Sequence, residues 1–210
     1  MNDFWPLLTR LGETGILLPA ALLVMLALAH RPITRPLAFR WFAFLCGASL
    51  MTAASKVAFM GWGLGSAALN FTGISGHSMV AAAIYPLLLV TLASHAPPVA
   101  QRIALATGFA LALLVGISRL AVDAHSVSEV IAGLLLGSAA SAAVIARTQL
   151  PRAVIGPLMP ALVAGWLLVM PIQAPPLETH GLMTQLSLTL SGHTTPHTRT
   201  ELFYTGQTTP

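Results

Sequence analysis

Charged residues are scarce in this sequence. Asp, Glu, Lys and Arg make up only 8% of its 210 residues, whereas a typical soluble domain is about 25% charged. So few charges cannot cover a surface that faces water, which excludes a soluble globular protein. The ten basic residues form no cluster, which excludes an electrostatic surface for nucleic acid. The single cysteine, Cys46, allows no internal disulfide.

Long apolar runs take the place of the missing charges. Hydrophobic residues make up 56% of the chain, and its mean hydropathy is +0.81. A helix needs about 20 apolar residues to cross the hydrocarbon core of a bilayer. Six stretches reach or approach that length: 14–30, 40–61, 77–95, 101–118, 127–147 and 153–172. The connections are short, so the sequence predicts an all-α polytopic membrane protein, with about six transmembrane helices in an antiparallel bundle over residues 1–172.

Arginines mark alternate connections between these stretches. They follow the first, third and fifth stretches: Arg31, Arg35, Arg40, Arg102, Arg147 and Arg152. The positive-inside rule places these connections in the cytoplasm and puts the N-terminus, residues 62–76, residues 119–126 and the tail on the opposite side. Asp3 and Glu13 precede the first stretch, which predicts a retained span instead of a cleaved signal peptide.

Two polar features stand at the ends of apolar stretches. Lys56 is the only lysine, and a charge inside a bilayer costs about 2.5–3.5 kcal/mol. It has either a functional role or a side chain that extends to the interface. Ser75, Gly76 and His77 begin the third stretch, where exposed N–H groups of a helix start bind phosphate and Gly76 allows close approach. The alternative is a plain helix start with an interfacial histidine.

A third segment, from Ser118 to Glu129, is more specific. Arg119 and His125 flank the short turn between two stretches, and Glu129 follows His125 by one helical turn. A carboxylate there would accept a hydrogen bond from one imidazole nitrogen and leave the other free to attack. Arg119 offers a planar fork suited to phosphate oxygens. The alternative is a helix start at which Glu129 only interacts with the helix dipole. Burial of an acid inside a membrane span costs free energy, which makes that role alone a poor explanation.

These segments resemble the type 2 phosphatidic acid phosphatase family, which is related to vanadium haloperoxidases and bacterial acid phosphatases. The family shows a lysine motif, then Pro-Ser-Gly-His, then Ser-Arg, five residues, His, three residues and Asp. The resemblance covers about residues 50–147 and implies a six-helix membrane core. It implies that His125 is a nucleophile forming a phosphohistidine, that Glu129 orients it, and that His77 is the general acid. It also implies a set of residues that hold the phosphate: Lys56, Ser75, Gly76 and Arg119.

The sequence departs from the family pattern at three positions. Gly63 stands where the family places an arginine seven residues beyond its lysine, so one phosphate-binding cation is missing. Ile74 replaces the usual proline. Glu129 replaces the usual aspartate and adds one methylene group.

We therefore expect a hydrolase that removes a phosphate monoester or diphosphate from a lipid, without a metal or other cofactor and without nucleic acid. In a bacterial inner membrane, among membrane lipids, its site would face the periplasm. A catalytically impaired membrane binding protein, a small-molecule transporter, and a zinc site formed by His77, His125 and Glu129 are the alternatives. The sequence does not indicate an oligomeric state.

The tail, residues 173–210, differs from the rest of the chain. It is rich in Thr, Pro, Ser and His and has no apolar run long enough to span a bilayer. We expect an extramembrane extension with the composition of a disordered segment. Ser191-Gly192-His193 repeats the earlier tripeptide, with His197 nearby, but it begins no membrane helix. Truncation after residue 175 is therefore expected to leave most activity intact.

Overall fold

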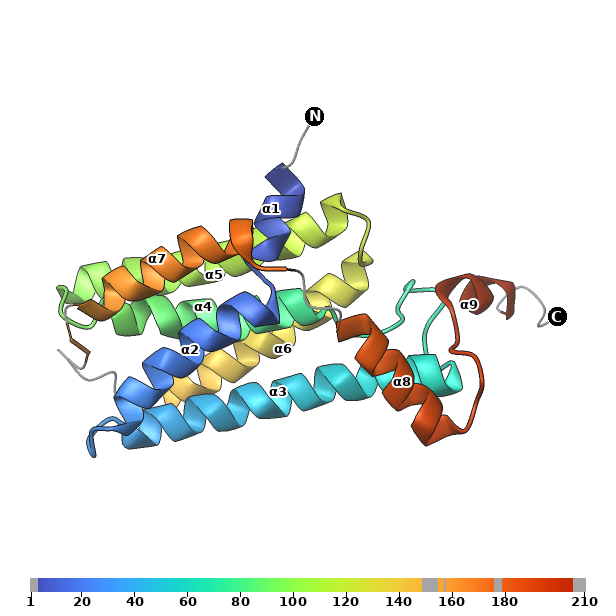
Figure 1. Ribbon diagram of the computed structural model, residues 1–210, viewed down its shortest axis with the longest axis horizontal. Coiled ribbons are helices and arrows are strands. Elements are labelled where there is room, and N and C mark those ends of the chain that lie inside the picture. Colours follow the sequence, from blue (N-terminus) through green and yellow to red (C-terminus); the bar gives the residue numbers. More distant parts are fainter. Residues whose placement is uncertain (1–3, 149–154, 157, 176–178, 206–210) are drawn as a thin grey trace.

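The computed structural model describes residues 4–148, 155–156, 158–175 and 179–205, and these residues form an all-α protein (Figure 1). Their one β-like feature is an isolated bridge between Ser66 and Phe71. The helices are α1 (Phe4–Arg10), α2 (Thr14–Ala29), α3 (Arg35–Trp62), α4 (Gly76–Leu92), α5 (Pro98–Ala121), α6 (Val127–Ala146), α7 (Leu158–Gln173), α8 (Thr179–Ser191) and α9 (Arg199–Thr205).

Four segments within the described residues are long and apolar enough to cross a membrane: Phe4–Ala29, Arg35–Trp62, Pro98–Ala121 and Val127–Ala146. The other two predicted spans correspond to α4 and α7, which are apolar but have only 17 and 16 residues. Large apolar side chains point outward on several helices, as Leu26, Leu50 and Leu168 do, and hydrocarbon is the medium that suits them. The protein is an all-α polytopic membrane protein, as predicted. Arg152 and parts of the predicted span 153–172 lie outside the described residues.

Helix α4 forms the centre of the bundle and packs mainly against α5 and α6 (Figure 1). Two glycines make this close packing possible. A Cβ atom on Gly108 of α5 would lie 2.5 Å from Pro86 Cα, and one on Gly137 of α6 would lie 2.2 Å from the Met79 carbonyl oxygen. No side chain fits at either position. Gly137 consequently holds the first turn of α4, which includes His77, in close contact with α6, and Gly108 holds a later turn against α5.

Helix α7 returns the chain to the end of the bundle where α4 begins. Near the opposite end, His95 Nε2 lies 2.6 Å from the carbonyl oxygen of Ile155. Along α7, Trp166 Nε1 donates to the Ile16 carbonyl oxygen at 2.8 Å. At its C-terminal end, Arg10 donates to the Ala174 carbonyl oxygen. The segment that follows α7 therefore starts beside the N-terminal end of α4.

The composition of the tail is typical of a disordered segment, but residues 179–191 and 199–205 are helical. Helix α8 packs across α3 (Figure 1). Small residues allow the two to approach: a Cβ on Gly61 would lie 3.3 Å from both the Ser187 carbonyl oxygen and Ser191 Cβ. Composition predicts disorder when too little apolar surface is available, but here the second surface is supplied by α3. The extramembrane location of residues 173–210 stays a prediction.

Candidate active site

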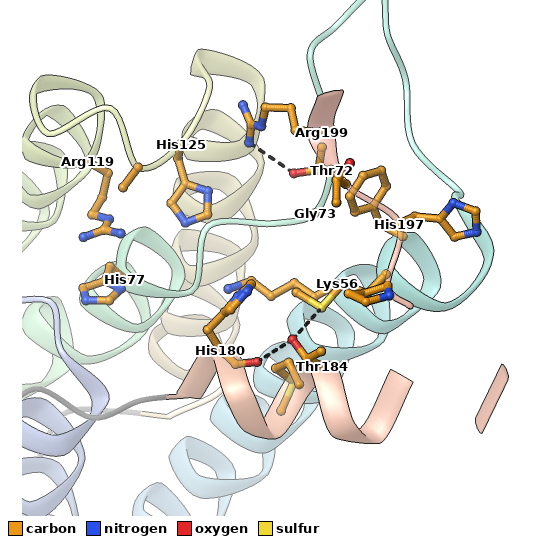
Figure 2. A pocket seen from close by; sticks show the side chains of 16 residues that line it. Lys56, Thr72, Gly73, His77, Arg119, His125, His180, Thr184, His197 and Arg199 are labelled. Carbon is orange, nitrogen blue, oxygen red and sulfur yellow. Dashed lines mark hydrogen bonds between the residues drawn. The ribbon is translucent and has the colours of Figure 1, made fainter. Parts of the chain in front are cut away.

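A cavity of about 490 Å³ lies at one end of the bundle, where α3 and α5 end and α4 begins. Four of the residues singled out from the sequence line it: Lys56, His77, Arg119 and His125. In Figure 2, His77, Arg119 and His125 gather on one side and His197 of the tail lies on the other, with Lys56 and His180 between them. The structure thus brings together side chains from three separate sequence motifs.

His125 and Glu129 form a hydrogen-bonded pair. His125 Nδ1 lies 2.8 Å from Glu129 Oε2, and the Glu129 side chain is fully buried. Since an ionised carboxylate only accepts hydrogen bonds, Nδ1 carries the proton and Nε2 has the free electron pair. The spacing of four residues along the chain, read from the sequence, produces this contact.

The helix start beside this pair holds Glu129 in place. Ser126 is the N-cap of α6, and its hydroxyl accepts a hydrogen bond from the Glu129 backbone N–H at 3.4 Å. The Glu129 carboxylate accepts one in return from the Ser126 N–H at 3.1 Å, which completes a capping box. The turn before it includes Asp123 with a positive φ of 52°, a conformation that Asp tolerates better than most residues. Glu129 therefore serves both the helix start and His125.

The pKa of His125 is lowered below its usual value. Burial is the main cause, because it penalises the charged ring, and the positive charges of Lys56 and Arg119 act in the same direction. The hydrogen bond and charge of Glu129 oppose this shift. The balance favours a neutral imidazole at neutral pH, which is the form that attacks an electrophile.

Lys56 and Arg119 place two positive charges at the cavity. The stem of Lys56 packs against Gly73, where a Cβ would lie 2.9 Å from Lys56 Cγ. Arg119 Nη1 donates to Thr9 Oγ1 at 2.9 Å, which connects α5 to α1. Arg119 Nε is buried and has no hydrogen-bond partner among the described residues. A buried N–H without a partner is costly, and an anion in the cavity is a suitable acceptor.

Ser75 and Gly76 lie at the start of α4 but do not line the cavity. The Ser75 hydroxyl is buried and lies 2.9 Å from the Ser78 hydroxyl, and the Ser75 N–H donates to the Glu129 carbonyl oxygen at 3.1 Å. Gly76 is nearer to the cavity, because a Cβ there would lie 3.9 Å from Lys56 Nζ. Their predicted role in holding phosphate stays a prediction. Within the described residues, His77, His125 and Glu129 are not arranged as a metal site.

Residues 61–152 match the family model of the PAP2 superfamily. This range contains His77, Arg119, His125 and Glu129, whose geometry is described above. This part of the chain, somewhat less than half of it, is similar to the PAP2 superfamily, the type 2 phosphatidic acid phosphatases.

Two curated relatives match the chain. The "Uncharacterized 22.5 kDa protein in cps region" of Klebsiella pneumoniae is 45% identical over 138 residues, which is 66% of this chain and 66% of that protein. Phosphatidylglycerophosphatase B of Bacillus subtilis (strain 168) is 37% identical over 70 residues, 32% of this chain and 34% of that protein. The matches thus span slightly less than two thirds and about one third of these relatives. No solved structure matches the chain significantly.

The tail, which lies outside the match to the PAP2 superfamily, contributes residues that sequence reasoning missed. His180, Met183, Thr184 and His197 line the cavity, and so does Arg199. Ser191-Gly192-His193 lies at the end of α8, where Gly192 has a positive φ of 73°, so it provides no helix start.

Two missed residues contact Glu129 directly. The Thr72 N–H donates to Glu129 Oε1 at 2.7 Å, and its hydroxyl does so at 2.6 Å. Arg199 Nη2 lies 2.8 Å from both carboxylate oxygens. Thr72 stands next to the Gly-Ile-Ser-Gly-His motif, so its proximity to the site could have been inferred. No feature of the sequence points to Arg199.

Proposed function

We propose that this protein is a phosphatase that hydrolyses a phosphate monoester or diphosphate of a lipid through a phosphohistidine on His125. The observation that carries the proposal is the His125–Glu129 pair. The buried Glu129 carboxylate lies 2.8 Å from His125 Nδ1 and so keeps the proton on that nitrogen. The same imidazole lines the cavity that Lys56 and Arg119 also line. A neutral nucleophile beside two cations suits an anionic electrophile such as phosphorus in a phosphate ester.

The first step would be attack of His125 Nε2 on phosphorus. A P–N bond forms, the P–O bond to the lipid breaks, and the imidazole becomes positively charged. Glu129 stabilises that charge through Nδ1. His77 lies in the same cavity, where the negative charge of the bound phosphate would favour its protonated form. The imidazolium of His77 would then donate a proton to the departing alkoxide and become neutral.

The second step would return the enzyme to its starting state. His77, now neutral, accepts a proton from water as the water oxygen attacks phosphorus. The P–N bond breaks, inorganic phosphate leaves, and both histidines regain their initial protonation. No metal is required in either step, because Lys56 and Arg119 supply the positive charge. Loss of a comparable donor typically costs about 10²–10³ in rate.

The location of the cavity supports a lipid substrate. It lies at the end of a membrane bundle, and Phe59, Met60 and Met183 give it an apolar side. A phosphate headgroup would meet the cations there while its chains remain among the apolar helices. Phosphatidylglycerophosphatase B, the name of the Bacillus relative, indicates the same substrate class. By the positive-inside rule, the cavity of a bacterial inner-membrane protein would open toward the periplasm.

The test is release of inorganic phosphate by purified protein in detergent micelles. The substrates are phosphatidic acid, phosphatidylglycerol phosphate and a polyprenyl diphosphate, each with and without a chelator. We expect activity that survives the chelator and is absent from His125→Ala. A quench during turnover of ³²P-labelled lipid should leave label on the protein that is labile in acid and stable in base.

Three results would contradict the proposal. They are activity that the chelator removes, activity that persists in His125→Ala, and lipid binding without turnover. The last result would support the impaired binding protein instead.

A further inference from the structure

The guanidinium group of Arg199 contacts the buried carboxylate that orients His125. Arg199 Nη2 lies 2.8 Å from Glu129 Oε1 and 2.8 Å from Oε2. The same nitrogen donates to Thr72 Oγ1 at 3.1 Å, and Nη1 donates to Asn70 Oδ1 at 3.0 Å (Figure 2 draws the contact with Thr72). The Arg199 side chain is 37% exposed, whereas that of Glu129 is fully buried. The tail thus provides a cation to an acid deep in the site.

Both carboxylate oxygens of Glu129 are occupied by donors. Oε1 accepts from the Thr72 backbone and hydroxyl and from Arg199. Oε2 accepts from His125, from the Ser126 N–H and from Arg199. Among the residues that the structure describes, Arg199 is the one donor that contacts both oxygens, and it carries a permanent charge. It therefore fixes the rotation of the carboxylate and compensates its charge where water does not reach.

Packing of the tail determines where Arg199 lies. The His197 N–H donates to the Met60 carbonyl oxygen at 2.9 Å, which attaches this segment to the end of α3. Thr198 and Glu201 then form reciprocal hydrogen bonds at the start of α9, at 3.0 Å and 3.4 Å. Arg199 is the first residue of that helix. Its backbone is held on both sides of the site contact.

The tail also packs on Gly63, one of the positions at which the sequence departs from the family pattern. Gly63 has a φ of 68°, in the left-handed region that disfavours a longer side chain. A Cβ there would lie 3.4 Å from the Nδ1 atom of His197. The segment that packs on Gly63 is the one that carries Arg199 to the cavity, two residues further along. The sequence has no arginine at position 63, and the segment that packs there carries the guanidinium group of Arg199.

We propose that Arg199 is a positioning residue of the active site, which acts through Glu129 to hold His125 in its reactive orientation. This inference rests on the proposed phosphatase function and assigns the tail a part in the same site. Loss of Arg199 would free the carboxylate to rotate and would remove a positive charge from the surroundings of His125. The ring would then bind a proton more readily, and the reactive neutral form would need a higher pH.

The groups that face His125 come from every element around the cavity. Glu129 of α6 favours the protonated ring, while nearby positive charges oppose it. Those charges are Lys56 of α3 and Arg119 of α5. Arg199 of the tail and the imidazoles of His77 (α4), His180 (α8) and His197 also line the cavity. Among them, Arg199 contacts the carboxylate itself, so its removal changes both the geometry and the charge of the pair.

The experiment compares Arg199→Ala and Arg199→Lys with the unmodified protein. The controls are Arg102→Ala, which removes an exposed arginine of α5, and His193→Ala, which changes a tail residue outside the cavity. Turnover of phosphatidic acid gives kcat, KM and their pH profiles, and thermal unfolding shows whether each variant is folded. For Arg199→Ala we expect kcat to fall about 10- to 100-fold, with KM within about threefold. The acidic limb of its profile should move to higher pH, and Arg199→Lys should recover part of both losses.

A double-mutant cycle separates action through Glu129 from other effects. Glu129→Asp withdraws the carboxylate from Arg199, so adding Arg199→Ala to that variant should change kcat by less than about twofold. Full additivity would overturn the proposal. So would an unchanged kcat and pH profile in Arg199→Ala, or a higher kcat, which would mark the contact as inhibitory. A raised KM with unchanged kcat would assign Arg199 to substrate binding instead.

A second readout does not require turnover. Diethyl pyrocarbonate modifies neutral imidazole, and mass spectrometry of the peptide that contains His125 gives its modification rate at each pH. The midpoint should lie at higher pH in Arg199→Ala than in the unmodified protein or in Arg102→Ala. If the unmodified protein releases no phosphate, the proposed function fails, yet this titration still decides the role of Arg199. An identical midpoint in both proteins would refute it.

Discussion

Exchange of Glu129 for glutamine tests how the catalytic pair works. The substitution keeps the length of the side chain but replaces one acceptor oxygen with an NH₂ group. Donors surround both oxygens: Thr72 and Arg199 at one, and His125, Ser126 and Arg199 at the other. Wherever the NH₂ group is placed, it meets a donor. When the NH₂ group turns toward His125, the Nδ1 atom has to accept its hydrogen bond.

That orientation places the remaining imidazole proton on Nε2 and removes the nucleophile. The corresponding change in serine proteases, where an orienting aspartate becomes asparagine, lowers kcat by about 10⁴. We expect a loss of about 10³–10⁴ for Glu129→Gln, together with destabilisation of about 1–3 kcal/mol from the unpaired buried group. Single-turnover release of ³²P-phosphate and thermal unfolding measure the two quantities.

Glu129→Asp is the matched comparison. It keeps the charge but shortens the side chain by one C–C bond, about 1.5 Å. The 2.8 Å contact with His125 would then exceed the length of a hydrogen bond unless the helix shifts. We expect a smaller loss of about tenfold, because the carboxylate still favours the correct tautomer. A Glu129→Gln enzyme within tenfold of the unmodified protein, or one slower by no more than Glu129→Asp, would refute the tautomer argument.

Three further predictions follow from other parts of the structure. Because burial lowers the pKa of His125, the acidic limb of the kcat/KM profile should lie below the ordinary histidine value of about 6.5; a limb above that value would contradict the neutral nucleophile. Truncation after residue 175 should remove most phosphatase activity from a protein that still inserts, the reverse of the outcome expected from sequence alone; full activity in the truncated protein would show that the tail is dispensable. Gly137→Ala should destabilise the bundle by about 1–3 kcal/mol because its Cβ would collide with the Met79 carbonyl oxygen, whereas Gly47→Ala, with no atom within 4 Å of the added Cβ, should not; equal melting temperatures would contradict this account of the packing around α4.

The bundle and the His125–Glu129 contact could be predicted because they depend on short-range patterns. Apolar runs show where helices cross a membrane, and a spacing of four residues places two side chains on the same helical face. The contact between Arg199 and Glu129 joins positions 70 residues apart. Nothing near Arg199 in the sequence marks it, because its role comes from the path of α7 and from the packing of α8 on α3.

The helices of the tail could not be predicted from its composition. Residues 179–191 contain many polar residues, and their apolar side chains are too few to form a core by themselves. Gly61 and Ser187 let α8 approach α3, so the missing apolar surface comes from a helix that is more than a hundred residues earlier. The order of α8 depends on its packing against α3, so the sequence of α8 alone does not predict it.

The return path of α7 has a consequence for how this architecture can change. Between Glu129 and Arg199 the chain runs away from the site along α6 and comes back along α7. Glu129 and Arg199 lie at the same end of the bundle only if the chain between them runs along the bundle an even number of times. Loss or gain of a single helix that runs the length of the bundle, such as α7, would place Arg199 at the other end, however well the remaining helices pack. Helix α7 and the segment after it are therefore constrained to be kept, lost or exchanged together, as one unit.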